Sequence, residues 1–79
     1  MVEGVQVRSG YDVKIYYHSG DVERVNGVDQ PTVTAHQILI TREVEDLVLQ
    51  WVGVWPAASV RKFEVLRAGT DELFLERFS

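Results

Sequence analysis

The stretch YDVKIYYH, residues Tyr11–His18, decides the fold class of this chain. Apolar and polar side chains alternate along it with a period of two, the repeat of a strand that buries one face. The sequence therefore predicts a strand with one core face and one mixed face. The predicted core face carries Tyr11, Val13, Ile15 and Tyr17.

Turn chemistry follows this strand directly. Ser19, Gly20 and Asp21 favour a reversal, because glycine tolerates positive φ and the Ser and Asp side chains bond to nearby amides. A return strand is expected over Val22–Val25. A second reversal is expected from Asn26-Gly27 to Pro31, because Pro31 cannot donate to a ladder.

The middle of the chain has a less regular pattern. We predict a strand over Thr32–Ile40 with a bulge near His36 or Gln37, then an exposed turn over Thr41–Asp46. A further strand is predicted over Leu47–Val52, with Leu47, Leu49 and Trp51 on its core face. A helix over residues 42–52 is the alternative, because four apolar side chains also fall at helical spacing: Val44, Leu47, Val48 and Trp51.

The C-terminal part begins at Pro56, which favours a single helical or 3-10 turn over residues 56–59. A strand over Val60–Arg67 and a last strand over Glu72–Phe78 are expected, with a helix over residues 57–68 as the alternative. With an opening strand at Val5–Val7, the chain has six or seven short strands at regular spacing. We therefore predict an all-β fold, a small antiparallel barrel or rolled sheet.

The segment from Gly53 to Val60 reads Gly-Val-Trp-Pro-Ala-Ala-Ser-Val and resembles the end of SH3 domains. That family has a glycine, an aliphatic residue, an aromatic residue, a proline, three further residues and a valine before its last strand. The resemblance implies an SH3-like small barrel. It does not imply binding of proline-rich ligands, because Ser59 stands where the family has a ligand-contacting tyrosine.

Composition supports one small β domain over residues 1–79. Fourteen residues are valine, which favours strands, and 79 residues suffice for only one core. The chain has no cysteine, no evident signal peptide and no long apolar run, so we expect a cytoplasmic protein of viral or bacterial type. Because a core this small contributes little stability and no disulfide supplements it, self-association is expected.

Few residues could support catalysis. The two histidines are isolated, and the Ser19 and Asp21 side chains near His18 are better explained as turn residues than as a catalytic triad. No metal-ligand spacing and no glycine-rich phosphate loop is present. We therefore expect no enzymatic activity, no cofactor and no metal.

Nucleic acid is the alternative partner. Lys14, Tyr16 and His18 are expected to share a strand face, and basic residues beside aromatic rings can bind single strands. The formal net charge of −4 opposes this function. The alternative depends on further basic residues converging on the same face, namely Arg24, Arg61 and Lys62.

Large aromatic side chains that fall outside the predicted core phase indicate a protein interface. Four side chains form this predicted interface: Tyr16, Trp55, Phe74 and Phe78. The sequence thus predicts a non-enzymatic protein–protein interaction module that self-associates.

Overall fold

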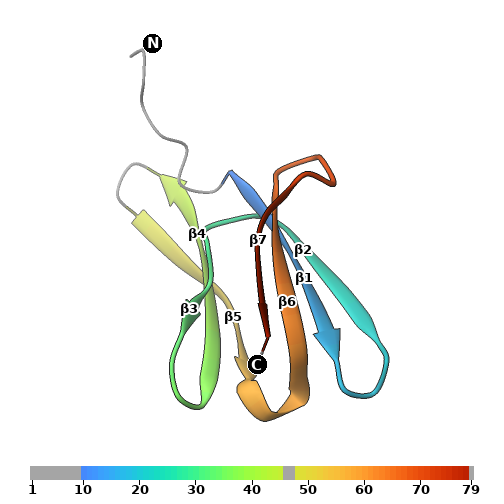
Figure 1. Cartoon of the computed structure of the whole chain (residues 1–79). Helices are drawn as coiled ribbons and strands as arrows, with labels where there is room; N and C mark the ends of the chain where they lie inside the picture. The colour runs from blue at the N-terminus through green and yellow to red at the C-terminus, as the bar shows by residue number, and fades with distance from the viewer. Residues whose placement is uncertain (1–9, 46–47, 79) are drawn as a thin grey trace.

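The computed structural model describes residues 10–45 and 48–78 and shows an all-β fold (Figure 1). Within these residues seven strands and one 3-10 turn, η1, follow one another along the chain. The predicted strand at Val5–Val7 and the side chain of Leu47 lie outside the described residues. The strands and the turn are β1 Tyr11–Tyr17, β2 Val22–Val28, β3 Thr32–Val33, β4 Gln37–Glu45, β5 Val48–Pro56, η1 Ala57–Ser59, β6 Val60–Arg67 and β7 Leu73–Phe78.

The strands form two antiparallel sheets. Sheet A has the order β2-β1-β6-β7, and sheet B has the order β3-β4-β5. No strand pairing joins the two sheets within the described ranges, so of the predicted barrel or rolled sheet a closed barrel is not formed. Both helical alternatives, over residues 42–52 and 57–68, are wrong, because the described residues of these segments lie in antiparallel strands, in the short turn η1 or, at Ala68, in the turn after β6. The described part of the chain contains no helix that could span a membrane.

One hydrophobic cluster fills the space between the sheets. Its fully buried side chains come from both sheets, and Val13 and Ile15 of β1 are among them, as the alternation of Tyr11–His18 predicted. Tyr11 and Tyr17 are partly buried against the same cluster. The other buried members are Val28, Ile38, Ile40, Val60, Phe63 and Val65.

Three predicted boundaries between β2 and β5 are wrong. Asn26-Gly27 does not reverse the chain but forms a bulge within β2, where Gly27 has a φ of 65°. The predicted strand Thr32–Ile40 is a hairpin, because the amides of His36 and Gln37 both donate to the Thr34 hydroxyl and turn the chain. Of the predicted exposed turn at Thr41–Asp46, the described residues 41–45 are instead the second half of β4, which ends at Glu45.

A bulge in β5 explains the largest error in the predicted core. Ile40 pairs with Gly53 and Thr41 pairs with Trp51, so Val52 is an extra residue with no partner in β4. Because one extra residue inverts the phase of a strand, Trp51 and Leu49 lie on the outer face of sheet B. They were predicted as core residues but are 65% and 45% exposed.

Candidate functional site

The outer face of sheet A carries a cluster of cations around Tyr16. Side chains of residues paired across neighbouring strands lie on the same face, and Tyr16 pairs with Lys62, which pairs with Phe78. The Lys62 Nζ lies 4.7 Å from the Tyr16 ring centroid and 5.7 Å from that of Phe78. Lys14 Nζ and Arg61 Cζ lie 5.5 and 5.8 Å from the Tyr16 ring, within the range of cation–π attraction.

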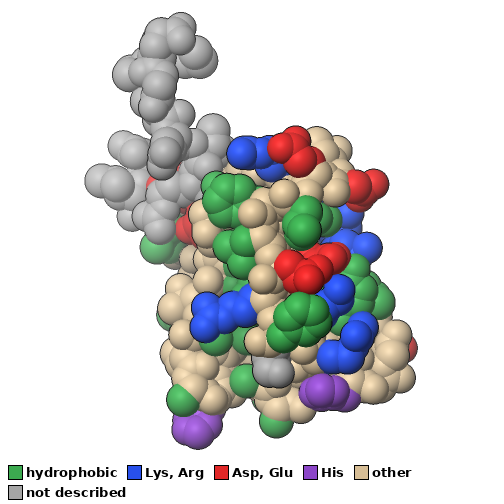
Figure 2. All heavy atoms as spheres, viewed as in Figure 1, with side chains coloured by type: hydrophobic (Ala, Val, Ile, Leu, Met, Phe, Trp, Pro, Cys, Tyr) green, Lys and Arg blue, Asp and Glu red, His purple; other side chains and the backbone are tan. Residues whose placement is uncertain are grey.

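Carboxylates neutralise much of this cation cluster. The Tyr16 hydroxyl donates a 2.6 Å hydrogen bond to Glu64, and Lys62 lies 3.7 Å from Glu64 and 3.4 Å from Glu76. The hydrogen bond from Tyr16, opposed by burial and aided by the Lys62 charge, lowers the pKa of Glu64. Figure 2 shows this mixture of charges: over β1, β2, β6 and β7, basic, acidic and hydrophobic side chains are interspersed.

The structure brings together only part of the predicted nucleic-acid face. Lys14, Arg61 and Lys62 converge around the Tyr16 ring on the outer face of sheet A, and Arg24, which pairs with Lys14, shares this face. His18 does not share their strand face, because β1 ends at Tyr17 and the His18 amide donates to the Ser59 carbonyl in η1. His18 instead lines a surface hollow with His36 and three alanines, Ala35, Ala57 and Ala58.

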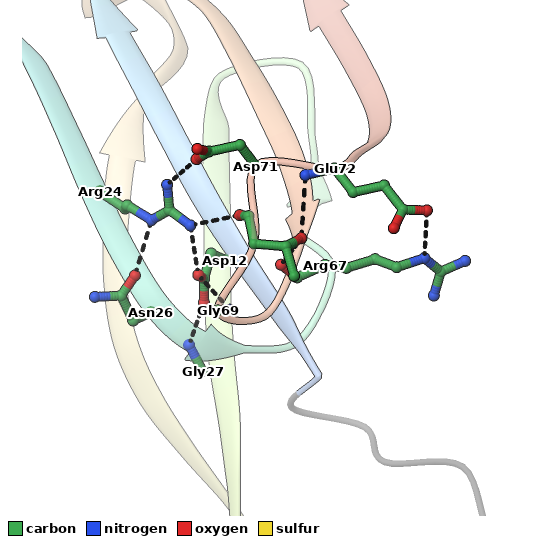
Figure 3. A network of polar contacts seen from close by, with 9 residues as sticks. Asp12, Arg24, Asn26, Gly27, Arg67, Gly69, Asp71 and Glu72 are labelled. Atoms are coloured by element: carbon green, nitrogen blue, oxygen red, sulfur yellow. Dashed lines mark hydrogen bonds and ion pairs between the residues drawn. The ribbon is translucent and has the colours of Figure 1, made fainter.

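Arg24 pairs with Lys14 on the outer face of sheet A, but a polar network engages its guanidinium (Figure 3). Its guanidinium donates to Asp12 at 2.7 Å, to Asp71 at 3.2 Å and to the carbonyl of Thr70 at 2.8 Å. Asp12 also accepts hydrogen bonds from the amides of Gly27 and Gly69, both at 3.0 Å. These contacts connect β1, β2 and the turn after β6, so Arg24 has a structural role.

The four predicted interface aromatics do not form one surface. Tyr16 and Phe78 share the outer face of sheet A, whereas the Phe74 ring lies 5.1 Å from the Tyr11 ring. Trp55 is partly buried against the core, so its predicted strand phase is wrong. Its indole Nε1 donates to the Tyr17 hydroxyl at 2.8 Å and thereby connects sheet B to sheet A.

Sheet B presents an apolar surface that the sequence analysis missed, which we call the β5 surface: Leu49, Trp51 and Val54. Their β4 partners are Glu43, Thr41 and Leu39, so all three side chains lie on the outer face of the sheet. They are 45–65% exposed. A sequence signal was present, because no residue from Val48 to Pro56 carries a charge.

The described residues offer little for metal binding or nucleophilic catalysis. No group of three potential metal ligands occurs within residues 10–45 and 48–78. The Ser19 hydroxyl donates to Asp21 at 3.1 Å in the turn after β1, so this hydroxyl is bonded within its own turn. Comparisons of the chain with protein-family models, curated proteins and solved structures found no match.

Proposed function

We propose that this chain is a non-enzymatic protein–protein interaction module that self-associates. The supporting observation is where its exposed apolar side chains lie. Of the nine large apolar side chains that are exposed in the described residues, five belong to β4 and β5. These five are Val44, Val48, Leu49, Trp51 and Val54.

Physical reasoning connects the three of these side chains that form the β5 surface, Leu49, Trp51 and Val54, to association. Soluble monomers rarely expose large contiguous apolar patches, and such patches commonly form interfaces. Tryptophan is also enriched among the residues that contribute most to binding, and Trp51 is 65% exposed. Burial of these side chains between copies would add apolar contact to a chain with a small core and no cysteine.

The mass of the chain in solution tests self-association. Sedimentation equilibrium and light scattering coupled to gel filtration should give a mass that rises from 9.0 kDa toward twice that value as concentration increases. The mass should fall again on dilution, because the association is reversible. A constant monomer mass up to the highest attainable concentration would contradict the proposal.

The SH3-like character of the fold is part of the same proposal. It is supported by the order strand, 3-10 turn, strand over β5, η1 and β6, which follows the Gly53–Val60 segment that resembles SH3 domains. The proposal covers the architecture only. Binding of proline-rich ligands is not proposed, because Ser59 differs from the ligand-contacting residue of that family.

Single-stranded nucleic acid is the second candidate partner, favoured by the three cations around Tyr16. The nearby Glu64 and Glu76 and the net charge of −4 oppose it. We therefore expect fluorescence anisotropy with a labelled oligonucleotide to show weak binding or none at physiological salt. Tight, salt-sensitive binding that a Lys14→Glu variant abolishes would rank this candidate first.

A further inference from the structure

β5 is an edge strand of sheet B. Within the described residues its only strand pairing is with β4. Its nine residues extend for about 30 Å at the usual rise of a strand. The backbone groups on its outer edge can therefore accept another strand, because unpaired edges are templates for strand addition.

Charge distinguishes β5 from the two edge strands of sheet A. β2 carries Glu23 and Arg24, and β7 carries Glu76 and Arg77, whereas β5 has no charged residue. When a strand pairs with its own copy about a two-fold axis, residues near the axis face residues of the same kind. A two-fold axis through one of the charged residues of β2 or β7 would place like charges opposite each other and oppose pairing, whereas no register of β5 with its own copy does so.

The acidic residues of sheet B do not prevent this pairing. Glu43 lies on β4, next to Leu49 of β5. If two copies pair through β5, their β4 strands are three strand spacings apart, or roughly 14 Å. That distance exceeds the Debye length of about 8 Å at physiological ionic strength, so repulsion between the two Glu43 side chains is largely screened.

The geometry also favours a closed pair over a growing chain. The opposite edge of sheet B is β3, which has only two residues and offers little for strand addition. A two-fold contact through β5 uses the same surface on both copies and leaves no second equivalent edge. With the two-fold axis near Trp51, the Leu49 and Trp51 side chains of both copies lie close together across the junction.

We propose that two copies of this chain pair antiparallel through their β5 edges and form one six-stranded sheet. This inference rests on the proposed function of self-association and names its surface and its partner. The β5 surface becomes the centre of the interface. The outer face of sheet A, with Tyr16 and Phe78, stays outside it.

A matched pair of substitutions tests the assignment. Trp51→Lys places a charge beside its copy at the junction, so the dissociation constant of the dimer should rise at least about tenfold. Phe78→Lys is the control, because Phe78 is 66% exposed, like Trp51 at 65%, but lies on sheet A. This control should leave the dissociation constant measured by sedimentation unchanged.

Hydrogen–deuterium exchange of the unmodified chain gives a second measurement, which does not depend on how a variant folds. Amides of β5 should exchange more slowly as protein concentration rises, whereas amides of β7 should not. A dimer that Phe78→Lys dissociates and Trp51→Lys does not would overturn the β5 assignment and leave self-association intact. A chain that is monomeric at every concentration would overturn both the β5 assignment and the proposed self-association.

Discussion

At the scale of single residues, Asp12 shows how pairing changes the environment of a side chain. It belongs to the polar phase of β1, yet it is only 3% exposed. Its carboxylate accepts hydrogen bonds from the amides of Gly27 and Gly69, which have φ of 65° and 74°, and from Arg24. Both glycines adopt left-handed conformations that other residues rarely take.

Replacement of Asp12 tests this network. Asp12→Ala should lower the free energy of unfolding by about 2–3 kcal/mol, because two amides and the Arg24 guanidinium lose their shared acceptor. Asp71→Ala is the control. It removes another carboxylate bound to Arg24, but one that is 96% exposed, so its cost should stay below about 1 kcal/mol in urea denaturation. Equal costs for the two variants would contradict the assigned role.

The same carboxylate predicts a dependence of stability on pH. Burial alone would raise the pKa of Asp12, but the hydrogen bonds from Arg24, Gly27 and Gly69 and the charge of Arg24 lower it below 3.8. A lowered pKa in the folded state contributes stability above the unfolded value, and that contribution is lost as pH falls through the folded value. The urea concentration at the midpoint of unfolding should therefore decrease when the pH is lowered below about 4. The Asp12→Asn variant should show a smaller decrease.

At the scale of the element, the bulge in β5 sets which residues face the core. Trp55 and Gly53 face Ile38 and Ile40 on the core side, and the extra residue Val52 also contacts the core. The Trp55 ring covers Gly53 so closely that an added Cβ would lie 2.8 Å from its Cη2 atom. Glycine is thus required at this position by the tryptophan that packs over it.

A double-mutant cycle tests this requirement. Gly53→Ala should lower the free energy of unfolding by about 1–3 kcal/mol, because the Trp55 ring must move away from the added methyl group. In a Trp55→Leu background the same change should cost much less, since the shorter side chain does not reach as far. Urea denaturation of the unmodified chain, the two single variants and the double variant gives the coupling free energy between residues 53 and 55. Equal costs in both backgrounds would show that another feature requires the glycine.

At the scale of the whole molecule, both sheets depend on one core. Ile15 comes from sheet A and Ile40 from sheet B, and both are fully buried in the same cluster. Trp55 and Tyr17 add a hydrogen bond between the sheets. The two sheets should therefore unfold together.

Cavities in either sheet should weaken the single core. Ile15→Ala and Ile40→Ala should each lower the free energy of unfolding by about 2–5 kcal/mol, in one transition seen alike by circular dichroism and tryptophan fluorescence. Leu49→Ala is the comparison, because this side chain is 45% exposed and should cost less than about 1 kcal/mol in the monomer. Separate transitions for the two probes would refute a shared core.

The sequence by itself determined the features that depend on near neighbours. The alternation of Tyr11–His18 predicted the β class and the buried Val13 and Ile15, and Pro56 predicted the 3-10 turn, which η1 confirms. These patterns are local, because strand periodicity and proline geometry are set within a few residues.

Only the tertiary structure decided the arrangement in two sheets, the burial of Asp12 and the exposure of Trp51. The two sheets follow from which strands pair, whereas the burial of Asp12 and the exposure of Trp51 each depend on a bulge, which is specified by the partner strand rather than by the strand itself. The bulge at Val52 inverts the phase of β5, and so a tryptophan predicted in the core lies on the surface proposed here to bind a second copy.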